Sequence, residues 1–300
     1  MSDDTILPEL REPLRRTDVS LPRWLIRAAL RVMPVPRDPE VRVRAVRVGP
    51  MRLRIYLPAR RGIGPGLLWV HGGGLLFGAA TQDESLCLST AKRLGIVIVS
   101  VDYRLAPEHP FPAAHDDVLA AWHWFLAHAD ELHVDPTRIA VGGESAGAGL
   151  AAGVAQRLHD DGGTQPVAQW LFAPMLDDRT AADRSLDARR HAVWDNEKNR
   201  AGWGAYLGAE PGTLTPPRYA APGRATDVAG LPAAFLTWTD TELFADENRA
   251  YADALDAAGV PVHVDLVVGG AHGFENWAKH TPVAQALIGR AQEWLGAAVR

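Results

Sequence analysis

The feature that most constrains the fold is a regular alternation of short apolar runs with longer helical patterns. The apolar runs lie at residues 66–70, 95–103, 138–143, 233–238 and 263–268. Continuous runs of this kind are typical of strands buried on both faces of a mostly parallel sheet. The helical patterns lie at 83–95, 115–132, 146–161, 246–259 and 281–299. Strands that alternate with helices form right-handed crossovers, so the sequence predicts an α/β fold.

Two elements precede this alternating region. Residues 41–58 alternate apolar and polar side chains around Gly49 and Pro50, which predicts an antiparallel hairpin. Residues 22–33 predict a helix, with one apolar face formed by Trp24, Leu25, Ala28, Ala29 and Val32.

One segment does not follow the alternating pattern. It is rich in Arg, Asp, Gly and Pro, and we interpret it as an insertion that lies on top of the sheet together with the N-terminal residues. The predicted division is a cap formed by 1–45 and 178–226, and a core formed by 46–177 and 227–300.

Composition excludes several classes of function. The 300 residues carry a formal net charge of −5 with scattered Lys and Arg, so we expect no nucleic-acid partner. No apolar run approaches the ~20 residues of a membrane span. The single cysteine, Cys87, cannot form an internal disulfide, and the charged N-terminus has no apolar signal core. We expect a soluble cytoplasmic protein, a monomer or a homodimer, in which some of the ten Trp line a cavity.

A candidate nucleophile follows the third of the apolar runs. Residues 143–147 read Gly-Glu-Ser-Ala-Gly, with a buried strand before them and a small-residue helix after them. This context is that of a nucleophile elbow, in which the two glycines avoid clashes at a sharp turn. We therefore predict that Ser145 lies at the carboxyl edge of the sheet.

A serine hydroxyl needs a neighbouring base, and His272 is the candidate among eleven histidines. It follows the last predicted strand, in a loop that opens on the same edge of the sheet as Ser145. Four other histidines, His115, His123, His128 and His133, lack the i, i+4 spacing of a helical zinc site. We expect no metal.

Three consecutive glycines, Gly72–Gly74, follow a predicted strand and a histidine. Attack by serine on an ester carbonyl forms an oxyanion, which fixed N–H donors stabilise. Backbone amides can approach that oxygen only where no side chain intervenes, which explains the glycine run. The N–H of Ala146, directly after the serine, is a further donor.

Four motifs together resemble the hormone-sensitive-lipase-type branch of the α/β-hydrolases, in its microbial esterase form. They are His71–Gly74, 101–117, 143–147 and 272–274, in the order of that family. The resemblance implies an eight-stranded sheet, a Ser–acid–His triad, a helical cap and hydrolysis of short-chain carboxylic esters without a cofactor. It also implies that Gly73, Gly74 and Ala146 are the oxyanion donors, and that His71 and the segment from Tyr103 to Asp117 support the glycine loop. One departure is Leu75, where the family commonly has an aromatic residue.

The acid of the triad is the least obvious residue. Between the serine and the histidine, one strand exit offers Asp240, Glu242, Asp246 and Glu247. The family usually has an aspartate four residues before an Asp-Glu pair, and Asp246-Glu247 resembles that pair. Counting back four residues gives Glu242, where glutamate replaces the usual aspartate. Asp240 and Asp246 remain alternatives.

The sequence thus predicts a serine carboxylesterase acting on a small-molecule ester. Hydrolysis of amides, lactones or aryl esters by the same residues stays open, because the cap builds the leaving-group pocket. A ligand-binding protein without catalysis is a further alternative, since the plant gibberellin receptors resemble this branch but lack the triad histidine. His272 is present here, which argues against that alternative.

Overall fold

The computed structural model describes residues 5–17, 22–32, 34–59, 62–213 and 215–300. Its centre is an eight-stranded sheet with the order β1-β2-β4-β3-β5-β6-β7-β8. The strands are β1 (Val41–Val48), β2 (Met51–Pro58), β3 (Gly64–Val70), β4 (Val97–Asp102), β5 (Val134–Glu144), β6 (Ala168–Phe172), β7 (Ala233–Thr239) and β8 (Val262–Val267). The predicted α/β fold is confirmed.

Strand directions agree with the sequence pattern. The strands β3 to β8 pair in parallel, whereas β2 pairs antiparallel with both β1 and β4. The predicted hairpin is confirmed, with Gly49 at a positive φ of 56° in its turn. The apolar runs did not reveal β6, because this strand has only five residues and Gln169 interrupts its apolar side chains.

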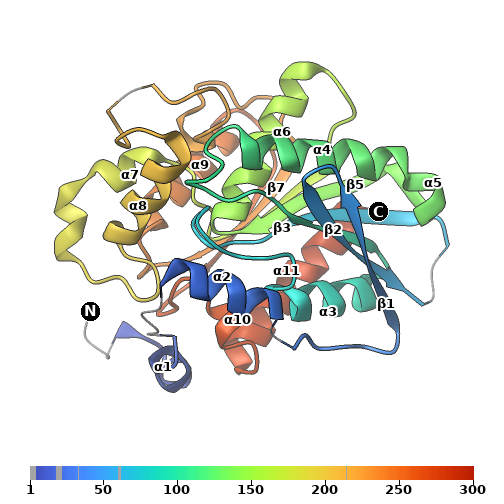
Figure 1. Ribbon diagram of the computed structural model, residues 1–300, viewed down its shortest axis with the longest axis horizontal. Helices are drawn as coiled ribbons and strands as arrows, with labels where there is room; N and C mark the ends of the chain where they lie inside the picture. Colours follow the sequence, from blue (N-terminus) through green and yellow to red (C-terminus); the bar gives the residue numbers. More distant parts are fainter. Residues whose placement is uncertain (1–4, 18–21, 33, 60–61, 214) are drawn as a thin grey trace.

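Helices cover both faces of the sheet (Figure 1). One face carries α4 (Ala113–Ala127), α6 (Ala146–Asp161) and α9 (Ala245–Ala257), and the other carries α3 (Glu84–Leu94) and α11 (Pro282–Ala298). Beneath α3 and α11, Trp69, Trp170 and Phe172 pack edge to face with ring centroids 4.7–5.8 Å apart. The short helices are α1 (Pro8–Arg15), α2 (Arg23–Val32), α5 (Ala129–Leu132) and α10 (Phe274–Trp277).

The predicted apolar face of α2 is wrong in two of its members, one of them its largest side chain. Trp24 is 70% exposed, and Ala28 is exposed as well. Leu25 and Ala29 of the predicted face are half-buried, but Ile26 and Arg27 are half-buried as well, and Arg27 makes three hydrogen bonds to the rest of the protein. The side chain of Val32 lies outside the described residues.

Four short helices lie between β6 and β7, within the segment that we interpret as an insertion. They are α7 (Asp178–Ala182), η2 (Arg184–Ala188), α8 (Asn196–Leu207) and η3 (Pro222–Arg224). Figure 1 shows α7 and α8 together on the side of the molecule away from the β1–β2 hairpin. The first strand already begins at Val41, inside the predicted 1–45 segment, and residues 1–4, 18–21 and 33 of that segment lie outside the described residues. The division into cap and core stays a prediction.

Two further sequence features have structural counterparts. Cys87 is buried in α3. Within the ranges described above, none of the helices combines the length and the apolar character needed to cross a membrane.

Candidate active site

The three predicted triad residues follow three parallel strands. Ser145 comes directly after β5, Glu242 comes shortly after β7, and His272 lies in the loop after β8. Because parallel strands share one carboxyl edge, these three loops open on the same side of the sheet.

The structure brings the three side chains into contact. His272 Nε2 lies 2.9 Å from Ser145 Oγ, and His272 Nδ1 lies 2.5 Å from Glu242 Oε2. The side chain of His272 is 7% exposed and that of Glu242 is fully buried. These contacts form a continuous line from hydroxyl to imidazole to carboxyl, with little access for water.

The backbone at Ser145 has the conformation of a sharp strand-to-helix turn. Its φ of 55° and ψ of −121° are unusual for a residue with a side chain, and such strain persists only where the surroundings hold it. Ser145 N–H donates to the carbonyl oxygen of Phe172 at 2.8 Å. A Cβ on Gly147 would lie 2.1 Å from the carbonyl oxygen of Val70, and one on Gly143 would lie 2.6 Å from the same oxygen. Both glycines are therefore required by close backbone contacts.

Glu242 and His272 are each fixed by a second contact. Thr239 N–H donates to Glu242 Oε1 at 2.8 Å, and Trp277 Nε1–H donates to the carbonyl oxygen of His272 at 2.9 Å. The ring of Phe244 packs edge-on against the imidazole, with centroids 5.3 Å apart.

The two alternative acids lie elsewhere. The carboxylate of Asp240 accepts the N–H of Gly269 at 2.7 Å, which holds the start of the loop that carries the histidine. Asp246 is exposed in the first turn of α9. Of the candidates from this strand exit, Glu242 is the one in contact with His272.

The glycine loop presents backbone donors beside Ser145. Gly73 and Gly74 have φ values of 111° and 59°, which residues with a Cβ rarely adopt. The carbonyl oxygen of Gly73 accepts the N–H groups of Leu76 and Phe77, each at 3.1 Å. In the part of the chain that the structure describes, the N–H groups of Gly73, Gly74 and Ala146 have no acceptor.

The insertion packs directly on this loop. A Cβ on Gly74 would lie 2.0 Å from the six-membered ring of Trp194. A Cβ on Gly202, in α8, would lie 2.7 Å from the carbonyl oxygen of Gly74. Leu75, where the family commonly has an aromatic residue, is 3% exposed and has a φ of 65°, whereas Phe77 lines the cavity instead.

A cavity of about 640 Å³ opens above the triad. Ser145, His272, Gly73 and Gly74 form its floor, and apolar side chains form most of its walls. These side chains come from α2, from the glycine loop, from the insertion and from α10, and include Ile26, Leu76, Phe77, Val193, Trp194 and Trp277. The expectation that some tryptophans line a cavity is confirmed.

A cluster of buried carboxyl groups surrounds Asn276, near Ser145. The side-chain amide of Asn276 donates to Asp83 Oδ1 at 2.6 Å and also to Glu144 Oε2. Burial, with the nearby charges of Asp83 and Glu275, raises the pKa of Glu144 well above its usual range. Burial likewise raises the pKa of Glu275 to about 7. Sequence patterns did not predict this cluster, because its members come from three separate segments of the chain.

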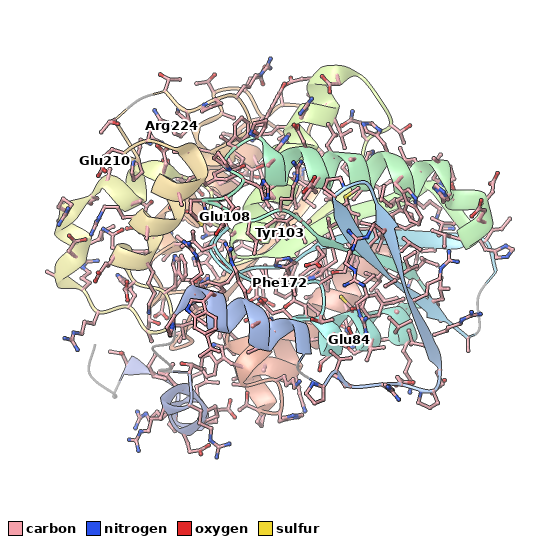
Figure 2. The ribbon with its side chains drawn as sticks, in the orientation of Figure 1. Glu84, Tyr103, Glu108, Phe172, Glu210 and Arg224 are labelled. Carbon is pink, nitrogen blue, oxygen red and sulfur yellow. The ribbon has the colours of Figure 1, made fainter. Side chains whose placement is uncertain are left out.

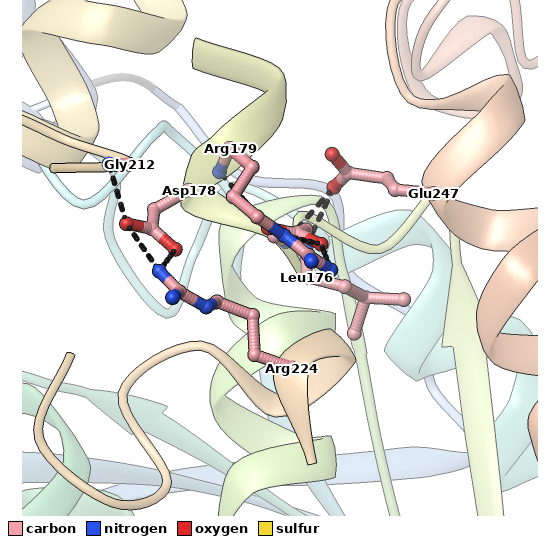
Figure 3. Close-up of polar contacts among 7 residues, drawn as sticks. Leu176, Asp178, Arg179, Gly212, Arg224 and Glu247 are labelled. Atoms are coloured by element: carbon pink, nitrogen blue, oxygen red, sulfur yellow. Dashed lines mark hydrogen bonds and ion pairs between the residues drawn. The ribbon is translucent and has the colours of Figure 1, made fainter. Parts of the chain in front are cut away.

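Polar contacts join the start of the 178–226 segment to its later residues and to α9 (Figure 3). The buried carboxylate of Asp178 accepts the N–H of Gly212 at 2.7 Å and pairs with Arg224 Nη1 at 2.9 Å. Glu247 Oε1 accepts the N–H of Leu176 at 2.7 Å, so α9 is tied to the start of the insertion.

The segment predicted to support the glycine loop does contact it. Tyr103 O–H donates to the carbonyl oxygen of His71 at 3.0 Å, and the two rings stack with centroids 4.3 Å apart. Arg104 pairs with Asp117 at 2.8 Å within the same segment. His71 is fully buried beneath the loop.

Comparison with known proteins agrees with this geometry. A family model for the alpha/beta hydrolase fold matches residues 67–276. Esterase LipI of Mycobacterium tuberculosis is 36% identical over 276 residues, which cover 88% of this chain and 85% of LipI. Carboxylesterase NlhH of the same organism is 36% identical over 279 residues, covering 88% of this chain and 86% of NlhH. A solved structure of a bacterial heroin esterase has a TM-score of 0.88 at 33% identity, with complete coverage of both chains. Esterase LipW from Mycobacterium marinum has a TM-score of 0.83 at 32% identity, covering 99% of this chain and 97% of LipW.

The chain belongs to the α/β-hydrolase fold family, in its hormone-sensitive-lipase-type branch. Its relatives over most of its length are esterases and carboxylesterases, and the chain is a carboxylic ester hydrolase.

Proposed function

We propose that this carboxylesterase hydrolyses short-chain esters through an acyl-enzyme formed on Ser145. The single observation that carries the proposal is the line of contacts from Ser145 through His272 to Glu242 on the floor of a cavity of about 640 Å³. Serine supplies the hydroxyl that attacks the ester, histidine is the base that takes its proton, and glutamate orients the histidine.

In the first half of the reaction, Ser145 Oγ attacks the acyl carbon and His272 Nε2 takes the hydroxyl proton. An ionised Glu242 only accepts, so Nδ1 of the imidazole carries its hydrogen and Nε2 is left to accept the proton. The imidazolium that forms is stabilised by the carboxylate and returns the proton to the leaving alcohol. Water then attacks the acyl-enzyme by the same steps, which releases the acid and restores Ser145.

The oxyanion of each tetrahedral intermediate is proposed to accept the N–H groups of Gly73, Gly74 and Ala146. These groups have no acceptor within the described residues, and each fixed donor of this kind contributes roughly 3 kcal/mol to the transition state. The steps require no cofactor and no metal.

The preference for short acyl chains is argued from the cavity. Trp194 and Phe77 form walls close to the glycine loop, with ring centroids 6.4 Å apart. These aromatic walls also favour a second candidate, hydrolysis of aryl esters by the same triad. The cytoplasmic location and the choice between monomer and homodimer stay predictions.

The test is a substrate panel measured on wild type and on Ser145→Ala. The panel contains p-nitrophenyl esters from acetate to decanoate, phenyl acetate, an anilide and a lactone. We expect the highest kcat/KM on acyl chains of about two to six carbons, and Ser145→Ala to lose nearly all activity while folding normally. A folded Ser145→Ala variant within tenfold of wild type would refute the proposed nucleophile. A maximum at decanoate would refute the preference for short chains.

A further inference from the structure

The N-terminal helix α2 reaches the glycine loop through one side chain. Arg27 is 18% exposed, and its guanidinium donates to three acceptors. Nε–H donates to the carbonyl oxygen of Leu76 at 2.8 Å, and Nη2–H donates to that of Ala106 at 2.7 Å. Nη1–H pairs with Glu108 Oε2 at 2.9 Å, and Glu108 is labelled in Figure 2.

The carbonyl of Leu76 belongs to a peptide unit that acts on the proposed oxyanion hole. In a trans peptide, the C=O and the following N–H point in opposite directions. The N–H on the other side of the Leu76 carbonyl is that of Phe77, and it donates to the carbonyl of Gly73 at 3.1 Å. The N–H on the other side of the Gly73 carbonyl is that of Gly74. Two peptide units therefore connect the guanidinium of Arg27 to the Gly74 N–H.

We propose that Arg27 is a positioning residue that orients and polarises the Gly74 N–H toward the oxyanion. A cation at one end of a chain of hydrogen-bonded peptide units polarises each successive donor, so the last N–H binds a negative oxygen more strongly. The proposal rests on the proposed function, because it requires Gly74 to be an oxyanion donor.

The same guanidinium also holds the two loops that shape this turn. Ala106 N–H donates to the carbonyl of Leu75 at 3.0 Å, so the loop after β4 and the glycine loop are already joined beside Arg27. Leu75 has a positive φ of 65° without being glycine, and such a conformation persists only when neighbouring contacts hold it. The hydrogen bonds from Arg27 fix the carbonyl groups of Leu76 in the glycine loop and of Ala106 in the loop after β4, on either side of the hydrogen bond between Ala106 and Leu75.

The effect should therefore appear in catalysis more than in substrate binding. For Arg27→Gln we expect kcat on p-nitrophenyl butyrate to fall about 10- to 30-fold, less than the 10²–10³ that follows loss of a whole oxyanion donor. We expect KM to change by less than twofold. Arg27→Lys keeps the charge but replaces the planar guanidinium, which donates from two separate nitrogens, by a single ammonium nitrogen, so we expect an intermediate kcat.

The decisive readout is inhibition by an alkyl trifluoromethyl ketone. Addition of Ser145 Oγ to its carbonyl carbon, with proton transfer to His272, places a negative oxygen in the oxyanion hole. We expect the inhibition constant to rise in Arg27→Gln by the same factor by which kcat falls. Glu108→Gln is the matched control, because it removes the ion pair and leaves both carbonyl contacts; we expect its kcat and inhibition constant within twofold of wild type. Trp24→Ala, an exposed residue of the same helix, controls for a general disturbance of α2.

Each outcome decides a different point. If Arg27→Gln has a kcat within twofold of wild type, or loses kcat with an unchanged inhibition constant, the proposal is wrong. If Arg27→Gln does not fold, Arg27→Lys is judged by the same two criteria. An active Ser145→Ala variant would instead refute the proposed function itself, whatever the Arg27 variants show.

Discussion

Glu247 offers a test of how α9 is attached to the segment that follows β6, because its side chain is buried next to Leu176 and Asp177. One carboxylate oxygen accepts the N–H groups of Leu176 and Asp177, at 2.7 and 3.4 Å, and the other has no partner within the described residues. Burial raises the pKa of Glu247 from 4.5 to about 8, although the hydrogen bond from Leu176 N–H acts in the opposite direction. The folded protein therefore favours the neutral carboxyl.

The size of the effect follows from proton linkage. A carboxyl whose pKa is higher in the folded state than in the unfolded state contributes stability at low pH that is lost as the pH rises through the interval between the two pKa values. Here that interval runs from 4.5 to about 8. At about 1.4 kcal/mol per pH unit, Glu247 alone lowers the free energy of unfolding by up to about 4 kcal/mol between pH 5 and pH 8.

Urea unfolding of wild type and Glu247→Gln at several pH values measures this directly. Glutamine keeps an acceptor for the Leu176 N–H but does not titrate. The amide NH2 group of glutamine takes the place of the second oxygen, which has no partner among the described residues. This replacement changes the free energy of unfolding by an amount that does not depend on pH. We expect the stability of the variant relative to wild type to increase from pH 5 to pH 8 and then to level off. Glu210→Gln, at an exposed position labelled in Figure 2, controls for the loss of a negative charge. A difference between Glu247→Gln and wild type that is the same at every pH would show that this reasoning is wrong.

Four further substitutions test the site. Glu242→Gln should lower kcat about 10³- to 10⁴-fold with normal folding, whereas Asp240→Asn should stay within threefold; the reverse order in steady-state kinetics would exchange their roles. Trp194→Ala should move the preferred acyl chain to greater length, with a gain of about fourfold in kcat/KM for each of the first added methylenes; an unchanged chain-length profile would mean that Trp194 does not limit the acyl pocket. Gly74→Ala should lower kcat strongly, because its Cβ would lie 2.0 Å from Trp194; near-normal kcat would mean that the glycine is needed for neither space nor oxyanion binding.

Local signals in the sequence were enough to predict seven of the eight strands, the turn at Ser145 and the side chains that contact one another there. Position along the chain was enough to identify each of these residues. Ser145 lies in the Gly-Glu-Ser-Ala-Gly motif, Glu242 follows β7, and His272 follows the last strand. Glu242 could be identified in this way because a parallel sheet brings strand ends together, whatever lies between them. The short β6 was missed because five residues with one glutamine carry too little periodicity.

Contacts between distant segments could not be predicted in the same way. The placement of Trp24 on a buried face failed because the helix pattern of 22–33 does not show which side meets the protein; the structure exposes Trp24 and turns Arg27 inward. The contact of Trp194 with Gly74 joins residues 120 positions apart, and nothing near either residue encodes it. Such pairs follow from packing of the whole chain and leave no local periodicity.

These long-range contacts have a consequence for how specificity and rate can vary in this protein. Trp194 forms a wall of the cavity and also touches Gly74, so a substitution there changes the pocket and the proposed oxyanion loop together. Arg27 contacts the same loop through the carbonyl oxygen of Leu76. Ala201 also lines the cavity, but within the described residues it makes no hydrogen bond to the glycine loop. Larger side chains at Ala201 should therefore shorten the acyl pocket while leaving the oxyanion donors in place, whereas changes at Trp194 cannot separate the two effects.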